Sequence, residues 1–304
     1  SSAASDVYKR QYRDFMEGII KKRKRLLPVR VEFSRELDGD IVDKICEYLD
    51  LDGKYVFRGS SPLDLSFVFQ IQDSLRNHPE LFYEKRVPQK STQIDSKRSI
   101  LEQIKEKDKL LSYPYESMDP FLQLIKEAAF HPDVMTIKIT IYRLAKKARL
   151  VEYLCAAAEN GKEVTVLIEL RARFDEQNNI DWSERLEEAG CRVLYGFDGY
   201  KVHSKLCLIT YRNRNEIRYI TQVGTGNYNE KTAKMYTDYS LMTSHQGIGE
   251  DAVVFFKNMS IGNLDGEYHH LIVSPFSLKR KVLRHMDDCL LYTSPSPRDG
   301  ATSR

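Results

Sequence analysis

The chain has 304 residues, enough to bury a core in one large or two modest domains, and its 41% hydrophobic and 30% charged residues are ordinary for a globular protein. There is no run of about 18 apolar residues and no apolar N-terminal segment, so the sequence predicts neither a membrane span nor a signal peptide. Five cysteines without CxxC spacing are typical of a reduced, cytoplasmic protein, and a net charge of +3 does not by itself predict a polyanion partner.

Both ends of the chain differ in composition from its body. Residues 1–11 and 291–304 show no hydrophobic periodicity, and the second segment is rich in serine, proline and arginine. We expect both to be non-native tails without structure, similar to translated adapter sequence. We therefore expect the natural chain to continue beyond both ends.

Residues 12–89 form a first region. Apolar residues at helical spacing, Ile41, Ile45, Tyr48 and Leu49, predict a helix. "KYVFRG" then predicts a short strand, and the apolar segment "DLSFVFQIQ" fits either a helix or a strand. The polar stretch over residues 89–99 is the best candidate for a linker.

From residue 100 onward, helical and strand patterns alternate. The helices are expected over residues 116–130, 148–162 and 180–190, and the strands over 134–144, 163–170, 191–196, 205–213 and 217–224. Pro120 near the start of the first helix and Gly161 at the end of the second are typical helix boundaries. The pattern predicts an α/β domain with a mixed, mostly parallel sheet over residues 90–273. Residues 274–290 would begin a further unit.

The segment "YKVHSKLCLI" reads as a strand that carries an ionisable pair. Side chains of a strand alternate between faces, so His203 and Lys205 are expected to lie side by side. The pair either lines a site or forms a solvated patch. Further charged side chains follow the other predicted strands and suggest a concave cationic pocket at the strand ends: Arg143, Arg171, Arg173, Asp175 and Glu176.

A single histidine among cations suits phosphoryl transfer. Imidazole, with an ordinary pKa of about 6.5, is mainly neutral and nucleophilic near neutral pH, and neighbouring cations lower that pKa further. "GTGN" adds the backbone N–H of Gly226, which can approach a phosphate closely, and the amide of Asn227. Metal binding is disfavoured because His203 has no second histidine or cysteine at ligand spacing. A Ser/His/Asp hydrolase is disfavoured because no GxSxG motif occurs.

Several longer segments resemble one known family. They are "YPYESMDPFLQLIKEAAFHPDV", "IKITIYR", "ELRARFDEQNNIDWSERLEEAG", "YKVHSK" and "VGTGNYNEKTAKMYTDYSLMT". Together they resemble the bacterial-type polyphosphate kinases, which belong to the phospholipase D-like superfamily. The resemblance covers nearly all of residues 100–290. It implies that residues 12–89 are part of an α+β head domain, that residues 90–273 are a phospholipase D-like catalytic domain with the first half-site, and that residues 274–290 begin the second catalytic domain.

The resemblance also implies an activity and its residues. The family reversibly transfers the terminal phosphate of ATP to inorganic polyphosphate through a phosphohistidine, with Mg²⁺. His203 matches the phosphorylated histidine, Tyr236 the tyrosine that contacts ATP, and Arg143 and Arg173 the two arginines assigned to Mg²⁺ and phosphate. Because arginine is a poor metal ligand, we interpret both as binding the phosphates that carry the ion. Lys205 is the second catalytic candidate.

The expected substrates are ATP or ADP and inorganic polyphosphate, with no nucleic-acid partner. The resemblance further suggests a cytoplasmic enzyme, peripheral membrane contact, and a homo-oligomer for the full-length protein.

Two positions depart from related patterns. Gln222 stands where many family members carry a histidine, and glutamine can accept neither a phosphoryl group nor a proton. Thr210 stands where phospholipase D-like phosphodiesterases usually carry an aspartate, which disfavours a phosphodiesterase or nuclease. The fragment is expected to be incomplete for catalysis, so a non-catalytic module that binds polyanions is the other alternative.

Overall fold

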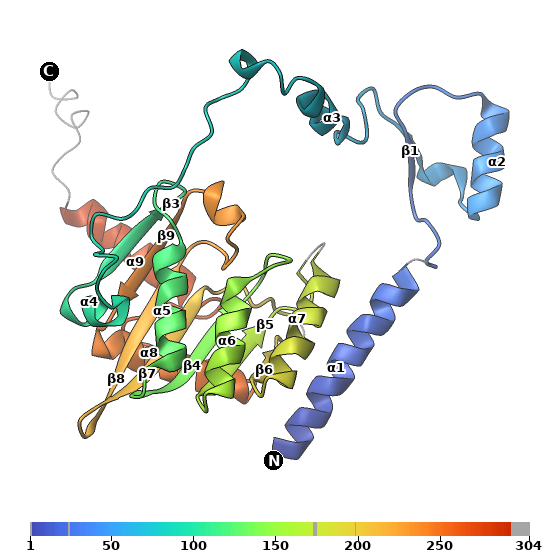
Figure 1. Ribbon diagram of the computed structural model, residues 1–304. Coiled ribbons are helices and arrows are strands. Elements are labelled where there is room, and N and C mark those ends of the chain that lie inside the picture. The colour runs from blue at the N-terminus through green and yellow to red at the C-terminus, as the bar shows by residue number, and fades with distance from the viewer. Residues whose placement is uncertain (1, 24, 173–174, 198, 293–304) are drawn as a thin grey trace, which may run out of the picture. The chain divides into compact units, whose positions relative to one another are not determined.

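The computed structural model describes residues 2–23, 25–172, 175–197 and 199–292. The chain divides into two compact units (Figure 1). One consists of residues 10–86, and the other of residues 87–304 together with residues 1–9.

The unit over residues 10–86 contains the larger part of the 22-residue helix α1, several short elements and little core. Its elements are α1 (Ser2–Arg23), β1 (Val31–Phe33), α2 (Gly39–Leu49), η1 (Gly53–Tyr55), β2 (Val56–Arg58), α3 (Phe67–Ser74) and η2 (Pro79–Leu81). β1 and β2 form a parallel pair. The predicted helix α2 and strand β2 are confirmed, and the ambiguous apolar segment is the helix α3. Among the described side chains of this unit, the buried apolar ones are Met16 and Leu51.

The expectation that residues 1–11 lack structure is wrong for residues 2–11, which form the first part of α1. They contain no glycine or proline, and alanine, lysine, arginine and glutamine among them favour a helix even without an apolar stripe. Of the segment 291–304, residues 293–304 lie outside the described part of the chain.

The larger unit is built on a seven-stranded sheet in the order β3-β9-β8-β7-β4-β5-β6. Its strands are β3 (Lys109–Tyr113), β4 (Val134–Ile141), β5 (Glu163–Ile168), β6 (Arg192–Tyr195), β7 (Leu206–Asn213), β8 (Glu216–Gly224) and β9 (Asp238–Thr243). The α/β class and the mixed sheet are confirmed. The expected parallel majority is wrong, because among the described strands of this sheet β4–β5 and β5–β6 pair in parallel and the other four pairs are antiparallel. The tight turn between Asn213 and Glu216, with Arg214 at a φ of 56°, forces β7 and β8 to be antiparallel.

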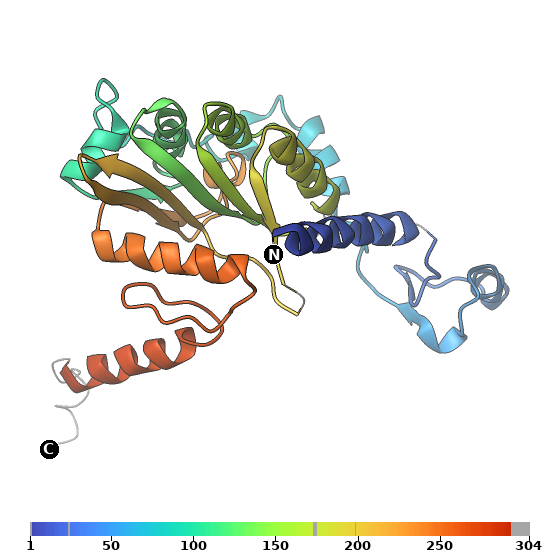
Figure 2. The same cartoon turned by 90° about the horizontal axis from the view of Figure 1, so that it is seen from below.

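Helices cover both faces of this sheet. The helices of this unit are α4 (Ile100–Glu106), α5 (Asp119–Phe130), α6 (Arg149–Glu159), α7 (Glu176–Glu188), η3 (Thr232–Lys234), α8 (Gln246–Ser260) and α9 (Leu278–Tyr292). In Figures 1 and 2, α5, α6 and α7 lie on one face and α8 lies on the other. β5 is buried on both faces, which explains why nearly every one of its residues is apolar.

Local signals in the sequence set the helix boundaries. Ser117 Oγ accepts a hydrogen bond from the N–H of Asp119 where α5 begins, and Pro120 lies in its first turn. After α6, Gly161 adopts a φ of 79°, a conformation that favours glycine and ends the helix as predicted. No described helix is long and apolar enough to cross a bilayer.

Candidate active site

His203 lies in an irregular segment between β6 and β7. The strand expected over residues 200–209 begins only at Leu206, so the prediction is wrong for residues 200–205. The ladder between β4 and β7 ends at the pair Ile139 and Cys207. Beyond it, the hydroxyl of Thr140 replaces the next rung, because it accepts from the N–H of Leu206 at 3.1 Å and donates to the carbonyl of Ser204 at 2.7 Å.

His203 and Lys205 nevertheless lie together, as their spacing predicted. His203 is exposed, whereas Lys205 is buried and its Nζ donates to the carbonyl oxygen of His203 at 2.5 Å. Both side chains contact the ring of Tyr142. The imidazole packs edge-on against it with ring centres 4.8 Å apart, and Lys205 Nζ lies 5.4 Å from its centre. The solvated patch considered from the sequence is therefore excluded for Lys205.

The environment shifts the pKa of both members of the pair downward. Partial burial lowers the pKa of His203 below its ordinary value, and the charges of Lys205, Lys201 and Arg143 lower it further. Burial lowers the pKa of Lys205 to about 8, against an opposing contribution from Asp238. At neutral pH the imidazole is therefore uncharged while most of the lysine keeps its ammonium.

Of the predicted arginines, the structure brings Arg143 to the pair. Its guanidinium carbon lies 5.4 Å from the centre of the Tyr142 ring, and its Nε lies 3.2 Å from a carboxylate oxygen of Asp175. Arg173 lies outside the described residues. Arg171 does not contribute to an open cationic pocket, because its side chain donates to backbone carbonyls.

The GTGN turn begins directly beside Lys205. The N–H of Gly224 donates to the carbonyl of Lys205 at 2.9 Å. At Gly226 the backbone approaches Asp238 so closely that a Cβ would lie 2.6 Å from its carboxylate, so only glycine fits without a shift. Thr225 Oγ1 donates to the same carboxylate at 2.8 Å. These contacts place the turn at the same end of the sheet as the histidine.

Two predicted residues of the following loop are less closely tied to His203. The side-chain oxygen of Asn227 is buried and has no hydrogen-bond partner among the described residues. Tyr236 is 62% exposed after η3. None of the described hydrogen bonds or ring contacts joins Tyr236 to His203.

Gln222 is part of a buried hydrogen-bond network. Its Nε2 donates to Ser240 Oγ at 3.0 Å, and its Oε1 accepts from the hydroxyl of Tyr228 at 2.5 Å. The ring of Tyr228 stacks on Phe121 of α5 with centres 5.0 Å apart. Gln222 therefore joins β8 to its neighbours on the α5 side of the sheet.

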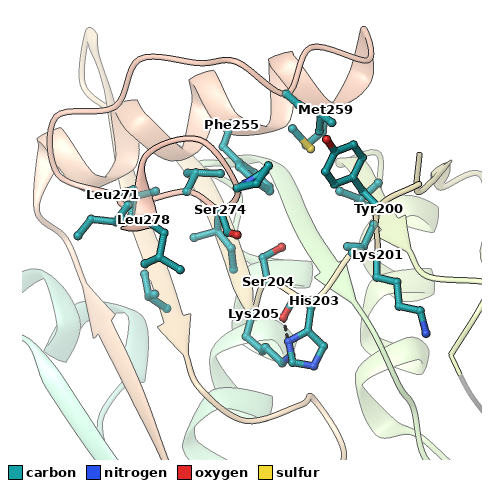
Figure 3. Close-up of a pocket in the computed structure, with 18 of the residues that line it drawn as sticks. Tyr200, Lys201, His203, Ser204, Lys205, Phe255, Met259, Leu271, Ser274 and Leu278 are labelled. Carbon is teal, nitrogen blue, oxygen red and sulfur yellow. Dashed lines mark hydrogen bonds between the residues drawn. The ribbon is translucent and has the colours of Figure 1, made fainter. Parts of the chain in front are cut away.

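A cavity of about 560 Å³ lies beside the segment that carries His203. Phe255 and Met259 of α8 line it together with Leu271, and the segment contributes His203, Ser204 and Lys205. In Figure 3, the side chains of His203 and Lys205 lie together at one end of this cavity, away from Phe255 and Met259. The imidazole of His203 and the ammonium of Lys205 therefore lie away from the apolar part of the cavity.

Three residues that position this site were not assigned a role from the sequence. Tyr142 is the common neighbour of His203, Lys205 and Arg143, Thr140 continues the ladder beyond β7, and buried Glu169 accepts two backbone N–H groups. One feature of the sequence could have indicated Glu169: it is a carboxylate at the end of an apolar strand, and a carboxylate buried there needs hydrogen-bond partners.

An α/β domain that presents an exposed, neutral histidine among cations at the edge of a mixed sheet defines a class of site suited to phosphoryl groups. Comparisons with known proteins agree with this class. Residues 99–263 match the family described as "Polyphosphate kinase C-terminal domain 1". The chain belongs to the polyphosphate kinase family.

Relatives show how much of the family the chain covers. It is 39% identical to the polyphosphate kinase of Staphylococcus epidermidis over 274 residues, which are 90% of this chain and 37% of that protein. It is 36% identical to the polyphosphate kinase of Bacillus anthracis over 291 residues, 94% of this chain and 42% of that one. The crystal structure of polyphosphate kinase from Porphyromonas gingivalis superimposes with a TM-score of 0.72 at 30% identity, over 86% of this chain and 40% of that one. The chain thus spans about two fifths of the length of these relatives.

Proposed function

We propose that this chain carries the phosphate-accepting half-site of a polyphosphate kinase, in which His203 receives the terminal phosphate of ATP and passes it to inorganic polyphosphate. The observation that carries the proposal is the state of His203, which is exposed, has a lowered pKa and lies among cations. A neutral imidazole can attack phosphorus, whereas an imidazolium cannot.

In the proposed reaction, an imidazole nitrogen of His203 attacks the γ-phosphorus in line with the departing oxygen of ADP. The N–P bond forms as the P–O bond to the β-phosphate breaks, and the reverse displacement by a terminal polyphosphate oxygen restores the imidazole. The ammonium of Lys205 and the guanidinium of Arg143 stabilise the charge on the transferred group. By family resemblance Arg173 assists them and Tyr236 contacts the nucleotide, while the Gly226 N–H and the Asn227 amide offer further phosphate contacts.

Mg²⁺ fits this proposal as part of the substrate. The described residues contain no cluster of three or more His, Cys, Asp or Glu side chains that could hold a metal ion. The charged groups that lower the pKa of His203 are the cations Lys205, Lys201 and Arg143, which favour phosphate oxygens over a free divalent ion. We therefore propose that the ion arrives on the ATP phosphates and that Arg143 and Arg173 contact those phosphates.

The test is to incubate the full-length protein that contains this chain with ATP labelled in its γ-phosphate and to look for acid-labile label. Wild type and a His285→Ala control on α9 are expected to incorporate label, and His203→Ala is expected to incorporate none. Label that persists in His203→Ala would refute the assignment.

A second candidate is a module that binds polyphosphate without turnover. Two observations favour this candidate for the 304-residue chain alone. The chain covers about two fifths of the length of its relatives, and the cations around His203 all belong to the chain itself. Polyphosphate binding by the 304-residue chain that weakens steeply with added salt, without ATP turnover, would support it.

A further inference from the structure

A buried carboxylate holds the backbone next to His203. Glu169 follows β5 directly and is 1% exposed. Its Oε2 accepts the N–H of Val202 at 2.7 Å, and its Oε1 accepts the N–H of Arg171 at 2.7 Å. Both carboxylate oxygens are therefore used on backbone donors, and one of those donors belongs to the residue that precedes the histidine.

Arg171 holds the same segment by its carbonyls. Its Nη2 donates to the carbonyl of Phe197 at 2.7 Å and to the carbonyl of Tyr200 at 2.6 Å, while Lys201 Nζ donates back to the carbonyl of Arg171 at 3.3 Å. Together with Glu169, these contacts join the end of β5 to four residues of the segment before His203.

The segment has little else to order it. Residues 200–205 form no strand, and their backbone bond to the neighbouring strand β8 is at the far end of the segment, where the carbonyl of Lys205 accepts from the N–H of Gly224. The space around the carboxylate is also filled, because a Cβ on Gly196 would lie 3.0 Å from Val202 Cγ2 and 3.4 Å from Glu169 Oε2. The position of the histidine is thus determined by side-chain hydrogen bonds on both sides, from Glu169 and Arg171 before it and from Thr140 after it.

The contacts of Glu169 differ from those of an ordinary buried ion pair. Its carboxylate lies 3.7 Å from Arg171 Nε, longer than its two hydrogen bonds to backbone N–H groups. A buried carboxylate is costly unless it is fully hydrogen-bonded, and here the hydrogen bonds that satisfy it are made to the segment that presents His203.

We propose that Glu169 is a positioning residue for His203, with Arg171 as its partner. Glu169 does not touch the transferred phosphate, and it acts by fixing the peptide at Val202 so that the imidazole stays beside Tyr142 and Lys205. The significance of that position rests on the proposed function, whereas the positioning itself does not.

The sharpest variant is Glu169→Gln, which keeps the shape of the side chain. A glutamine amide has one accepting oxygen, and its NH₂ group faces a second backbone donor, so one of the two N–H groups of Val202 and Arg171 loses its acceptor. The matched control is Glu127→Gln on α5. The Glu127 carboxylate also accepts two backbone N–H groups, from Ile100 and Leu101, but these belong to the start of α4.

The first measurement is amide hydrogen exchange of the 304-residue chain. Glu169→Gln is expected to speed exchange at residues 200–203 by about tenfold, the effect of losing one buried hydrogen bond, and to leave the start of α4 unchanged. Glu127→Gln is expected to give the reverse pattern. Arg171→Met serves as a second variant in case Glu169→Gln fails to fold, and it is expected to speed exchange in the same segment. Exchange at residues 200–203 that stays at the wild-type rate in a folded variant overturns the proposal.

The second measurement is the labelling of His203 by γ-labelled ATP in the full-length protein. Glu169→Gln is expected to lower the maximal rate by about tenfold and to change the ATP concentration for half-maximal rate by less than about twofold, since the nucleotide contacts remain. An equal loss in Glu127→Gln would mean that Glu169 contributes only general stability. If wild type itself takes no label, the proposed function fails, and the exchange measurement still decides the positioning.

Discussion

At the scale of single residues, burial acts on His203 and Lys205 in the same direction but with opposite chemical consequences. Each pKa is lowered, first by the loss of solvent around the charged form. For the histidine this favours the reactive neutral ring. For the lysine it removes, at alkaline pH, the ammonium that attracts phosphate in the proposed reaction. The two groups are in their useful states together only between the two pKa values.

The rate of His203 labelling by ATP should therefore depend on pH with two limbs. Below its ordinary pKa of 6.5, the rate is expected to rise with pH as the imidazole loses its proton. It is expected to fall as the pH passes about 8, where Lys205 loses its charge. Initial rates measured across this range in the full-length protein check both limbs.

The control for the alkaline limb is Lys205→Arg, because a guanidinium stays charged throughout the range. In that variant the fall near pH 8 should disappear. An unchanged alkaline limb would mean that another group causes it.

The network around Gln222 gives a second residue-scale prediction. Gln222→Ala leaves the hydroxyl of buried Tyr228 without its acceptor, so the free energy of unfolding should fall by about 1–3 kcal/mol. Urea unfolding of Gln222→Ala, Tyr228→Phe and the double variant measures this. Because the two residues share one hydrogen bond, the double variant should lose less than the sum of the single losses. Additive losses would contradict the network.

At the scale of elements, the contact between α8 and β8 depends on a close approach at Gly249. A Cβ at this position would lie 2.4 Å from Tyr219 Cβ, which is part of β8. The helix therefore cannot pack at its present distance with any larger residue, and α8 covers the face of the sheet that carries the cavity beside His203.

Gly249→Ala is expected to lower the free energy of unfolding by about 1–3 kcal/mol, because the helix must move away from the sheet. Gly39→Ala in α2 is the control, since a Cβ there meets nothing within 4 Å. Chemical denaturation measures the free energy of unfolding of both variants. Equal values would show that α8 can move away from β8 without a loss of stability.

At the scale of the whole molecule, the two units differ in how well their apolar surface is covered. The larger unit buries most of β5 and the inner faces of α5, α6 and α8. In the unit over residues 10–86, by contrast, α3 exposes apolar side chains, namely Phe67, Val68, Phe69 and Ile71. Exposed apolar groups of this kind contribute little to stability and are available to other surfaces.

Amide exchange of the intact chain should reveal this difference directly. Residues 25–86 are expected to exchange at low denaturant concentration, before the strands β4, β5 and β7 lose protection. A single concerted loss of protection across both units would contradict the expectation.

The sequence predicted the larger unit better than its sheet pairings. The predictions of α5, α6, β5 and β6 were correct because they rest on periodicities within each segment. The partners of β9 and β3 depend on contacts between distant segments, for which a single sequence gives no pattern. The proximity of His203 and Lys205 followed from their spacing, although the residues before Lys205 are held by side chains rather than by the ladder of a strand. The role of Glu169 could not be predicted, because its partner at Val202 is a backbone group 33 positions further along the chain.

The ion pair between Arg143 and Asp175 affects how a phosphate would bind at Arg143. Asp175 immediately precedes α7, where the first peptide N–H groups of the helix attract a carboxylate. If a phosphate binds the guanidinium of Arg143, the carboxylate of Asp175 loses that partner but remains beside the N–H groups at the start of α7. Binding of a phosphate at Arg143 would thus change the environment of the first turn of α7, and that turn would report whether the proposed phosphate site is occupied.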